Sequence, residues 1–253
     1  MDFWSNQTST KNQTVMKHFI ACLFLVSAAF SAQAQWGKVR GSGNITTETR
    51  STGDYDHVAV GGPFDVTLIA GTEGKINIEA DDNLLQYIIT EVKGDKLKIY
   101  VKNGVNIRPS GKIKATVPFK DLEGASLAGS GTMVNESPIT ASSFDCAVAG
   151  SGNLILDLKA DDIQASVAGS GNLRLSGRAD KIEMHVAGSG NVRANDLTAK
   201  IVEANVAGSG DIDFDCDDCD LTARVSGSGD IGYTGNTTRE DVKVSGSGKI
   251  RKH

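Results

Sequence analysis

The stretch Val148-Ala149-Gly150-Ser151-Gly152-Asn153-Leu154 recurs almost at once as Val167-Ala168-Gly169-Ser170-Gly171-Asn172-Leu173. Its Gly-Ser-Gly centre occurs seven times in the second half of the chain, starting at Gly129, Gly150, Gly169, Gly188, Gly208, Gly227 and Gly246. The intervals between these glycines are 21, 19, 19, 20, 19 and 19 residues. A fixed period in this range is typical of a solenoid, in which each repeat is a unit that stacks on the next.

Apolar residues flank the tripeptide at constant offsets. Two residues before its first glycine stand Leu127, Val148, Val167, Val186, Val206, Val225 and Val244. Four residues after that glycine stand Met133, Leu154, Leu173, Val192, Ile212, Ile231 and Ile250. Further apolar side chains lie at every second position, which is the period of a β-strand. Each repeat therefore holds two or three short strands. The glycines form a tight bend between two of them, because they lack a Cβ.

The pattern predicts an all-β fold, a single-stranded parallel β-helix (β-solenoid) with coils of about 19–21 residues. Stacked coils bury one another's inward faces in a continuous apolar column. The rungs should lie about 4.8 Å apart, and the chirality rule for parallel crossovers favours a right-handed coil. The alternative is a β-sandwich or β-prism built from hairpins. Repetition of one bend in the same sense argues against it.

The first half of the chain is also rich in strand patterns, but it lacks the strict repeat. Residues 35–120 alternate in polarity between Gly/Asn/Asp turns, and Gly41-Ser42-Gly43-Asn44-Ile45 copies the later motif. The Asp81-Asp82-Asn83 cluster predicts a helical turn after it. We interpret residues 35–253 as one β-solenoid head domain. Its irregular part, residues 35–120, caps the stack, and its regular part, residues 121–253, carries the Gly-Ser-Gly repeats.

Residues 1–34 have the features of an N-terminal extension and a signal peptide. Met16-Lys17-His18 begins a basic region, residues 19–30 are apolar, and Ala32-Gln33-Ala34 forms a cleavage site. Residues 1–15 precede this pattern, which indicates either an upstream start assigned in error or a long basic region. The apolar run is too short to span a membrane. We therefore predict an exported protein in the periplasm, at the cell surface or outside the cell, with no transmembrane span in the mature chain.

Charge and cysteine content restrict the class of protein further. Removal of residues 1–34 leaves 24 Lys/Arg and 30 Asp/Glu residues, an acidic balance that argues against nucleic acid as a partner. Cys146 occupies an inward row and should be buried. Cys216 and Cys219 span a turn and suit a local disulfide in an oxidising compartment. The pair lacks the βαβ context of a redox motif and the two further ligands of a zinc site.

The acidic stretch from Asp211 to Asp220 is the first candidate site. Alternation places Asp211, Asp213 and Asp215 on the outer face, where neighbouring carboxylates suit calcium. Their spacing, however, does not follow the calcium-binding nonapeptide repeat. Aligned coils also place Arg193 beside Asp213, as a cross-rung pair. We therefore favour a solvated acidic face and predict no metal site.

A second candidate lies on the outer face of the strand before the bend. Glu183, His185 and Glu203 should cluster there, and carboxylates beside a histidine suit acid/base chemistry on a sugar. A flat face provides no pocket, so a polar face with cross-rung pairs is the favoured interpretation. At the bend, a stacked ladder should satisfy backbone groups, formed by Asn153, Asn172, Asn191, Asp211 and Asp230. No catalytic or cofactor-binding residue is predicted.

The repeated Val-Ala-Gly-Ser-Gly-Asn-Leu pattern resembles the head GIN domain of putative autotransporter adhesins. Phe64-Asp65-Val66 and the segment Ala80-Asp81-Asp82-Asn83-Leu84-Leu85 resemble the N-terminal part of that family, and the similarity covers roughly residues 39–251. The resemblance implies an exported bacterial β-solenoid with an adhesive role, and it supplies no catalytic residues. We therefore predict a non-enzymatic adhesin-like or structural binding module of the cell envelope, with glycans, envelope components or proteins as partners. The alternative is a carbohydrate-active β-helix enzyme, a polysaccharide lyase or hydrolase, which a cleft lined with perturbed carboxylates would favour.

Overall fold

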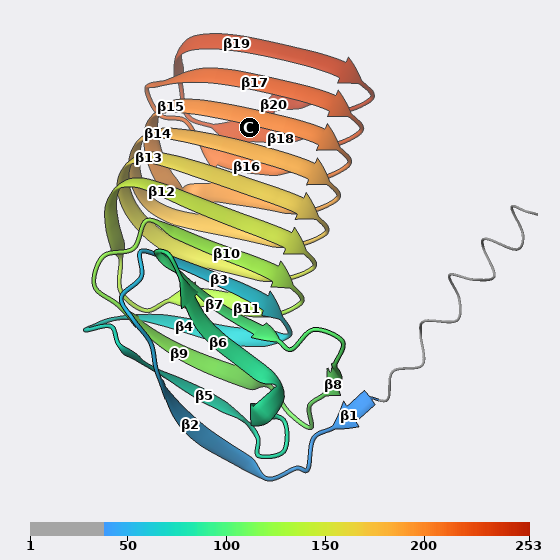
Figure 1. The fold of residues 1–253 in the computed structure, drawn as a ribbon. Helices are drawn as coiled ribbons and strands as arrows, with labels where there is room; N and C mark the ends of the chain where they lie inside the picture. Colours follow the sequence, from blue (N-terminus) through green and yellow to red (C-terminus); the bar gives the residue numbers. More distant parts are fainter. Residues whose placement is uncertain (1–37) are drawn as a thin grey trace, which may run out of the picture.

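The computed structural model describes residues 38–253, so the predicted signal peptide lies outside the described residues. Figure 1 shows strands stacked rung on rung along one axis, with the C-terminal repeats at the top. The strands are β1 (Lys38–Arg40), β2 (Ile45–Ser51), β3 (His57–Gly62), β4 (Phe64–Ala70), β5 (Lys75–Asp81), β6 (Ile88–Lys93), β7 (Lys96–Val101), β8 (Asn106–Arg108), β9 (Ile113–Phe119), β10 (Gly124–Gly129), β11 (Thr132–Asn135), β12 (Ile139–Gly150), β13 (Asn153–Gly169), β14 (Asn172–Gly188), β15 (Asn191–Gly208), β16 (Ile212–Asp215), β17 (Cys219–Gly227), β18 (Ile231–Thr234), β19 (Thr237–Gly246) and β20 (Ile250–Lys252).

The repeats form parallel rungs, which confirms the predicted solenoid. All the pairings among β10 to β20 are parallel, so the hairpin-built alternative is wrong. Their register brings the first glycine of each corner onto that of the next, as in Gly169 on Gly188. The 20-residue interval between Gly188 and Gly208 is absorbed by a register shift opposite Ser176, away from the corner.

The core is a stack of aliphatic rows that face each other across the coil. Val167, Val186, Val206 and Val225 lie in register, and each is at most 2% exposed. The row after the corner is equally buried, with Leu173 and Val192 at 1% and 0%. Burial of one such side chain stabilises the fold by about 1.5–3 kcal/mol, so the repeated rows supply most of the driving force.

The N-terminal part extends the same stack further than the sequence repeats indicate. β3 pairs in parallel with β10, and Gly62 lies on Gly129 as one corner glycine lies on another. β7 pairs with the other side of β3, while β4 lies between β11 and β9. Two additional rungs, β3–β4 and β7–β9, therefore lie below the repeats in Figure 1.

Antiparallel strands close the N-terminal end of the stack. β6 pairs with β7, β5 pairs with β9, and β2 pairs with β5, all antiparallel. The helical turn predicted after residues 81–83 is confirmed as the short 3-10 helix η2 (Leu85–Tyr87). β1 and β8 form a separate two-stranded sheet. No helix within residues 38–253 is long and apolar enough to cross a membrane.

Asp81 is a buried carboxylate that ties this end together. Its Oδ1 accepts hydrogen bonds from the Gly43 N–H at 2.8 Å and the Ser110 hydroxyl at 2.5 Å, and its Oδ2 accepts one from the Ser110 N–H at 2.9 Å. The early Gly41-Ser42-Gly43 copy of the repeat motif therefore wraps around a carboxylate and forms no rung corner. Burial alone would raise the pKa of Asp81, but these hydrogen bonds outweigh it, so that the pKa is lowered.

Substitution of Val186 tests the inward register. Val186→Asp places an unpaired charge between two rungs and should destabilise the fold by more than about 4 kcal/mol. Val186→Ala leaves a small cavity and should cost about 2 kcal/mol. Val244→Ala, in the same row but 43% exposed, is the matched control and should cost much less. Urea unfolding measures all three, and a wild-type midpoint for Val186→Asp would refute the register.

Asp81 should also make stability depend on pH. A carboxyl whose pKa is lowered in the folded state stabilises the fold fully at pH values above its ordinary pKa of 3.8. That contribution is lost as the pH falls from 3.8 through the lower pKa of the folded state. Asp81→Asn should cost about 1–3 kcal/mol at pH 7, because an amide NH₂ then faces backbone donors. The variant should lose less stability than wild type between pH 7 and pH 3. Asp54→Asn, at an exposed position, is the control, and equal pH profiles for Asp81→Asn and wild type would contradict this role.

Candidate functional site

The Gly-Ser-Gly corners form an exposed ridge along one edge of the stack. In Figure 1 this edge lies where the arrowheads of β10, β12, β13, β14, β15, β17 and β19 end. The backbone of each corner bonds to the corner below: the N–H groups of Ser170, Ser189 and Ser209 donate to Gly150, Gly169 and Gly188 carbonyls at 2.8 Å. Every serine side chain of the ridge is exposed, at Ser130, Ser151, Ser170, Ser189, Ser209, Ser228 and Ser247.

Both glycines of each corner are required by the backbone. The first glycine has φ between +109° and +141° in all seven corners, a region that side chains with a Cβ disfavour. A Cβ on Gly188 would lie 2.5 Å from the Gly169 carbonyl oxygen, and a Cβ on Gly190 would overlap the Gly171 oxygen and Val167 Cγ1. Serine is therefore the only corner residue that presents a side chain to a ligand.

A ladder of amides and carboxylates runs beside the ridge, as predicted. The Asn172 Nδ2 donates to Asn153 Oδ1 at 3.0 Å, and the Asn191 Nδ2 donates to Asn172 Oδ1 at 3.1 Å. Higher in the stack the side chains accept from backbone instead: the Asp230 N–H donates to Asp211 Oδ1 at 2.9 Å. These bonds satisfy polar groups where the strands restart after the bend, so the ladder has a structural role.

A groove lies at the foot of the ridge. It has a volume of about 800 Å³ and is widely open to solvent. Its walls are the lowest corners on one side and the segment after β7 on the other. None of its lining residues is charged; the side chains are those of Pro63, Val101, Val105, Asn106, Ile107, Ser130 and Ser151. Sequence analysis missed the groove because its walls come from segments that are far apart in the chain.

The predicted polar cluster lies on the open face of the stack. Glu183 is in register with Glu203, and the His185 Nε2 lies 2.8 Å from Glu183 Oε1. The Lys181 ammonium bonds to Glu203 Oε1 at 2.7 Å. The side chains of Glu183 and His185 are 33% and 50% exposed. The cluster is therefore the polar face with paired charges that the sequence predicted, and each carboxylate is already bonded to a neighbour.

The acidic stretch has the predicted alternation. Ile212 and Phe214 face inward, while Asp211, Asp213 and Asp215 lie on the outer side, and Arg193 is in register with Asp213. The Asp211 and Asp215 carboxylates accept hydrogen bonds from the next rung. Within residues 38–253, no group of three or more His, Cys, Asp or Glu residues has the arrangement of a metal site.

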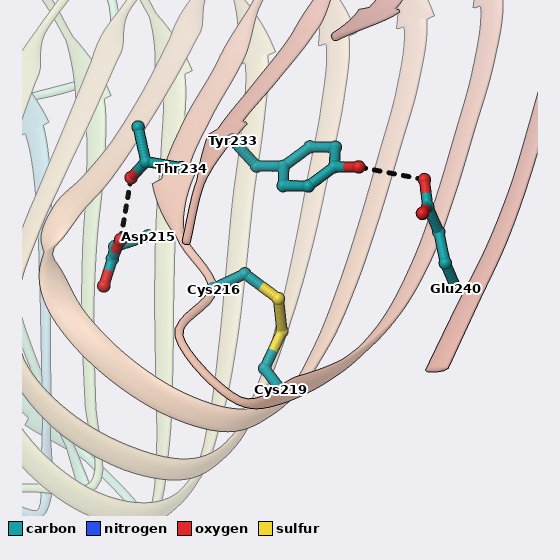
Figure 2. Close-up of a disulfide and its surroundings, with 6 residues drawn as sticks. All are labelled: Asp215, Cys216, Cys219, Tyr233, Thr234 and Glu240. Atoms are coloured by element: carbon teal, nitrogen blue, oxygen red, sulfur yellow. Dashed lines mark hydrogen bonds between the residues drawn. A yellow bond between two sulfur atoms is a disulfide. The ribbon is translucent and has the colours of Figure 1, made fainter. Parts of the chain in front are cut away.

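The cysteines behave as their positions predicted. Figure 2 shows the disulfide between Cys216 and Cys219, which closes a turn; both residues are fully buried. Beside it, the Tyr233 ring stacks on the Phe214 ring, with 5.9 Å between the ring centroids. The Tyr233 hydroxyl donates to Glu240 Oε1 at 2.9 Å. These contacts join the last coils. Cys146 is a free buried thiol whose pKa is raised by burial, so it is unreactive.

The sequence model of one protein family, described as "putative auto-transporter adhesin, head GIN domain", matches residues 54–237. A solved putative adhesin from Bacteroides fragilis NCTC 9343 is 25% identical, with a TM-score of 0.79 over 85% of this chain and 100% of that one. Two structures from Parabacteroides distasonis ATCC 8503 each align over 86% of this chain and 100% of their own. One is a putative adhesin (26% identity, TM-score 0.68) and the other a putative lipid binding protein (28% identity, TM-score 0.70). No curated protein matches the sequence.

The close contact at the corner gives a direct mutational test. Gly190→Ala drives a Cβ into the Gly171 carbonyl and should destabilise the protein by about 1–3 kcal/mol. Ser189→Ala changes only an exposed side chain and should stay within about 0.5 kcal/mol of wild type. Thermal unfolding of the two variants measures the difference. Equal tolerance at both positions would mean that the tripeptide is a flexible linker.

Proposed function

This chain belongs to the family of putative auto-transporter adhesin head GIN domains, and from that premise we propose that it is an exported, non-enzymatic binding module of the cell envelope. The relatives of known structure that are described as putative adhesins support the assignment. The stacked rungs provide a rigid support on which side chains keep fixed positions. Such a support suits adhesion or scaffolding, which require a stable surface and no conformational change.

The observation that carries the proposal is the uncharged groove at the foot of the serine ridge. Val101, Val105 and Ile107 give it an apolar wall, while Ser130 and Ser151 supply hydroxyls on the opposite side. Its lining residues offer no partner charge to a charged ligand. The groove therefore suits an uncharged, partly apolar segment of an envelope molecule, either a glycan or an acyl chain. The 28% identical relative described as a putative lipid binding protein supports an acyl chain as the ligand.

The serine ridge extends the same surface along the stack. Its hydroxyls repeat at the rung spacing, about 4.8 Å, so a long ligand seated in the groove meets a row of identical polar groups. Aromatic residues make up only 6% of the chain, which leaves few rings for sugar stacking. Single contacts should accordingly be weak, and avidity from several copies would supply the strength.

The polar cluster supports binding in preference to polysaccharide cleavage. A general acid and base must converge on one bond in a partly enclosed site. Here Glu183 is bonded to His185 and Glu203 to Lys181, side by side on an open sheet face. Turnover of a polysaccharide that disappears in a folded Glu183→Gln variant would overturn the non-enzymatic assignment.

The groove proposal is tested with the chain from Gln35 onward. A glycan array and an uncharged fluorescent acyl ester, methyl cis-parinarate, distinguish the two ligand sources. Val105→Asp places a charge in the groove and should weaken whichever interaction is found by about tenfold or more. Ile155→Asp, at a 42% exposed position outside the groove, is the matched control and should bind like wild type. Binding that is unchanged in Val105→Asp, or absent for both kinds of probe, would refute the groove as the binding site.

A further inference from the structure

The C-terminal end of the stack exposes side chains that every inner rung buries. Val242 and Val244 are 44% and 43% exposed, although they continue the inward rows of Ala223 and Val225, which are 0% and 2% exposed. The difference arises because β19 has a rung below it and none above it in residues 38–253. Two core positions of the solenoid therefore face outward at this end.

The strand that carries these valines is an open sheet edge. Within the described part of the chain, β19 pairs only with β17, so the N–H and C=O groups along its upper side lack strand partners. The opposite end of the stack differs. There the antiparallel strands β2, β5 and β6 close the sheets, and Ile76, Ile78 and Ile88 are at most 2% exposed. Within residues 38–253, the C-terminal end thus has an open edge at which side chains of the inward rows are exposed.

The outer row of β19 has an excess of positive charge. Asp241 is already held by Arg224 of the rung below, through two contacts of 2.7 and 3.3 Å. Arg239 and Lys243, on either side of Asp241, form no ion pair with any residue between 38 and 253. The neighbouring segment adds Lys249 and Lys252, while its Arg251 pairs with Asp230 at 3.4 Å. The acidic Glu240, in the inward row of β19, accepts a hydrogen bond from the Tyr233 hydroxyl. This basic end contrasts with the net charge of −5 of the whole chain.

We propose that the β19 edge docks an extended acidic strand of another polypeptide by β-strand addition. Main-chain bonds to the open edge would supply affinity, and alternate side chains would supply specificity. Apolar residues of the partner would cover Val242 and Val244, and acidic residues four positions apart would pair with Arg239 and Lys243. Those two cations are about 13 Å apart along an extended strand, so the spacing of the acids is fixed.

A second copy of this chain is a poorer fit for the same edge. A two-fold pairing of two C-terminal ends would bring like cations together, among them Lys249, Arg251 and Lys252 with their copies. Like charges opposed at an interface disfavour association. The charge of the edge therefore favours an acidic strand over a second copy of this chain. The β19 edge is separate from the groove, so an experiment can refute the docking proposal without refuting binding at the groove, and the reverse.

The test uses a fluorescein-labelled peptide, Thr-Glu-Thr-Thr-Val-Glu-Val, and the chain from Gln35 onward. Fluorescence anisotropy should show saturable binding that weakens as salt is added. Val242→Asp and the double variant Arg239→Glu with Lys243→Glu should each weaken binding by about tenfold or more. Ile155→Asp, an exposed apolar position on the side of the stack, should bind like wild type. Thermal unfolding should show that all variants are folded.

Two control peptides test charge and main-chain bonding separately. Replacement of both glutamates by lysine should abolish binding, and replacement of the central threonine by proline should weaken it, because proline lacks the N–H donor. Equal binding of the lysine peptide, or no binding of the acidic peptide, would overturn the proposal. A wild-type dimer by light scattering that Val242→Asp converts to a monomer would also overturn it, in favour of pairing between copies.

Discussion

Backbones of successive rungs approach so closely at the Gly-Ser-Gly corner that neither glycine can carry a Cβ. This contact sets the register of the whole stack. When glycine lies on glycine, the valine two residues earlier lies on the equivalent valine and the leucine four residues later on the equivalent aliphatic residue. The apolar column, the amide ladder and the outer rows all follow from that one alignment. An extra residue is accommodated on the side of the coil, opposite Ser176, because the corner leaves no room for it.

The same constraint determines which parts of the surface are available to a ligand. Within the coil, side chains alternate strictly between core and solvent, so the long faces carry flat rows of paired polar groups. The two surfaces that we propose for binding lie where the repeat begins and ends. At the N-terminal side, the segment after β7 stands against the lowest corners and forms the uncharged groove. At the C-terminal side, the last rung exposes core valines and an open strand edge. Both proposed binding surfaces thus arise at the boundaries of the repeat.

Much of the fold could be predicted from the sequence, because the repeat carries it. The Val167–Val225 row, the Asn153–Asn172 ladder step and the Cys216–Cys219 disulfide each follow from residue identity and a constant offset. The two N-terminal rungs could not be recognised from the repeat. The corner of β3–β4 reads Gly61-Gly62-Pro63 and lacks the serine, and residues 102–112, which connect β7 to β9, contain no Gly-Ser-Gly. The groove depends on contacts between distant segments. The exposed edge escapes a pattern-based prediction as well, because Val244 has the same sequence context as the buried Val225.

Hydrogen exchange of the corner amides tests the central claim most directly. Ser170, Ser189, Ser209 and Ser228 have exposed side chains, yet their backbone N–H groups donate to glycine carbonyls of the rung below at 2.8 Å. A corner that locks the stack should therefore open only with the surrounding strands. The account predicts that these four serine amides exchange as slowly as those of the flanking Val167, Val186, Val206 and Val225. Exchange of the serine amides at the rate of an unstructured peptide, beside protected valines, would contradict it.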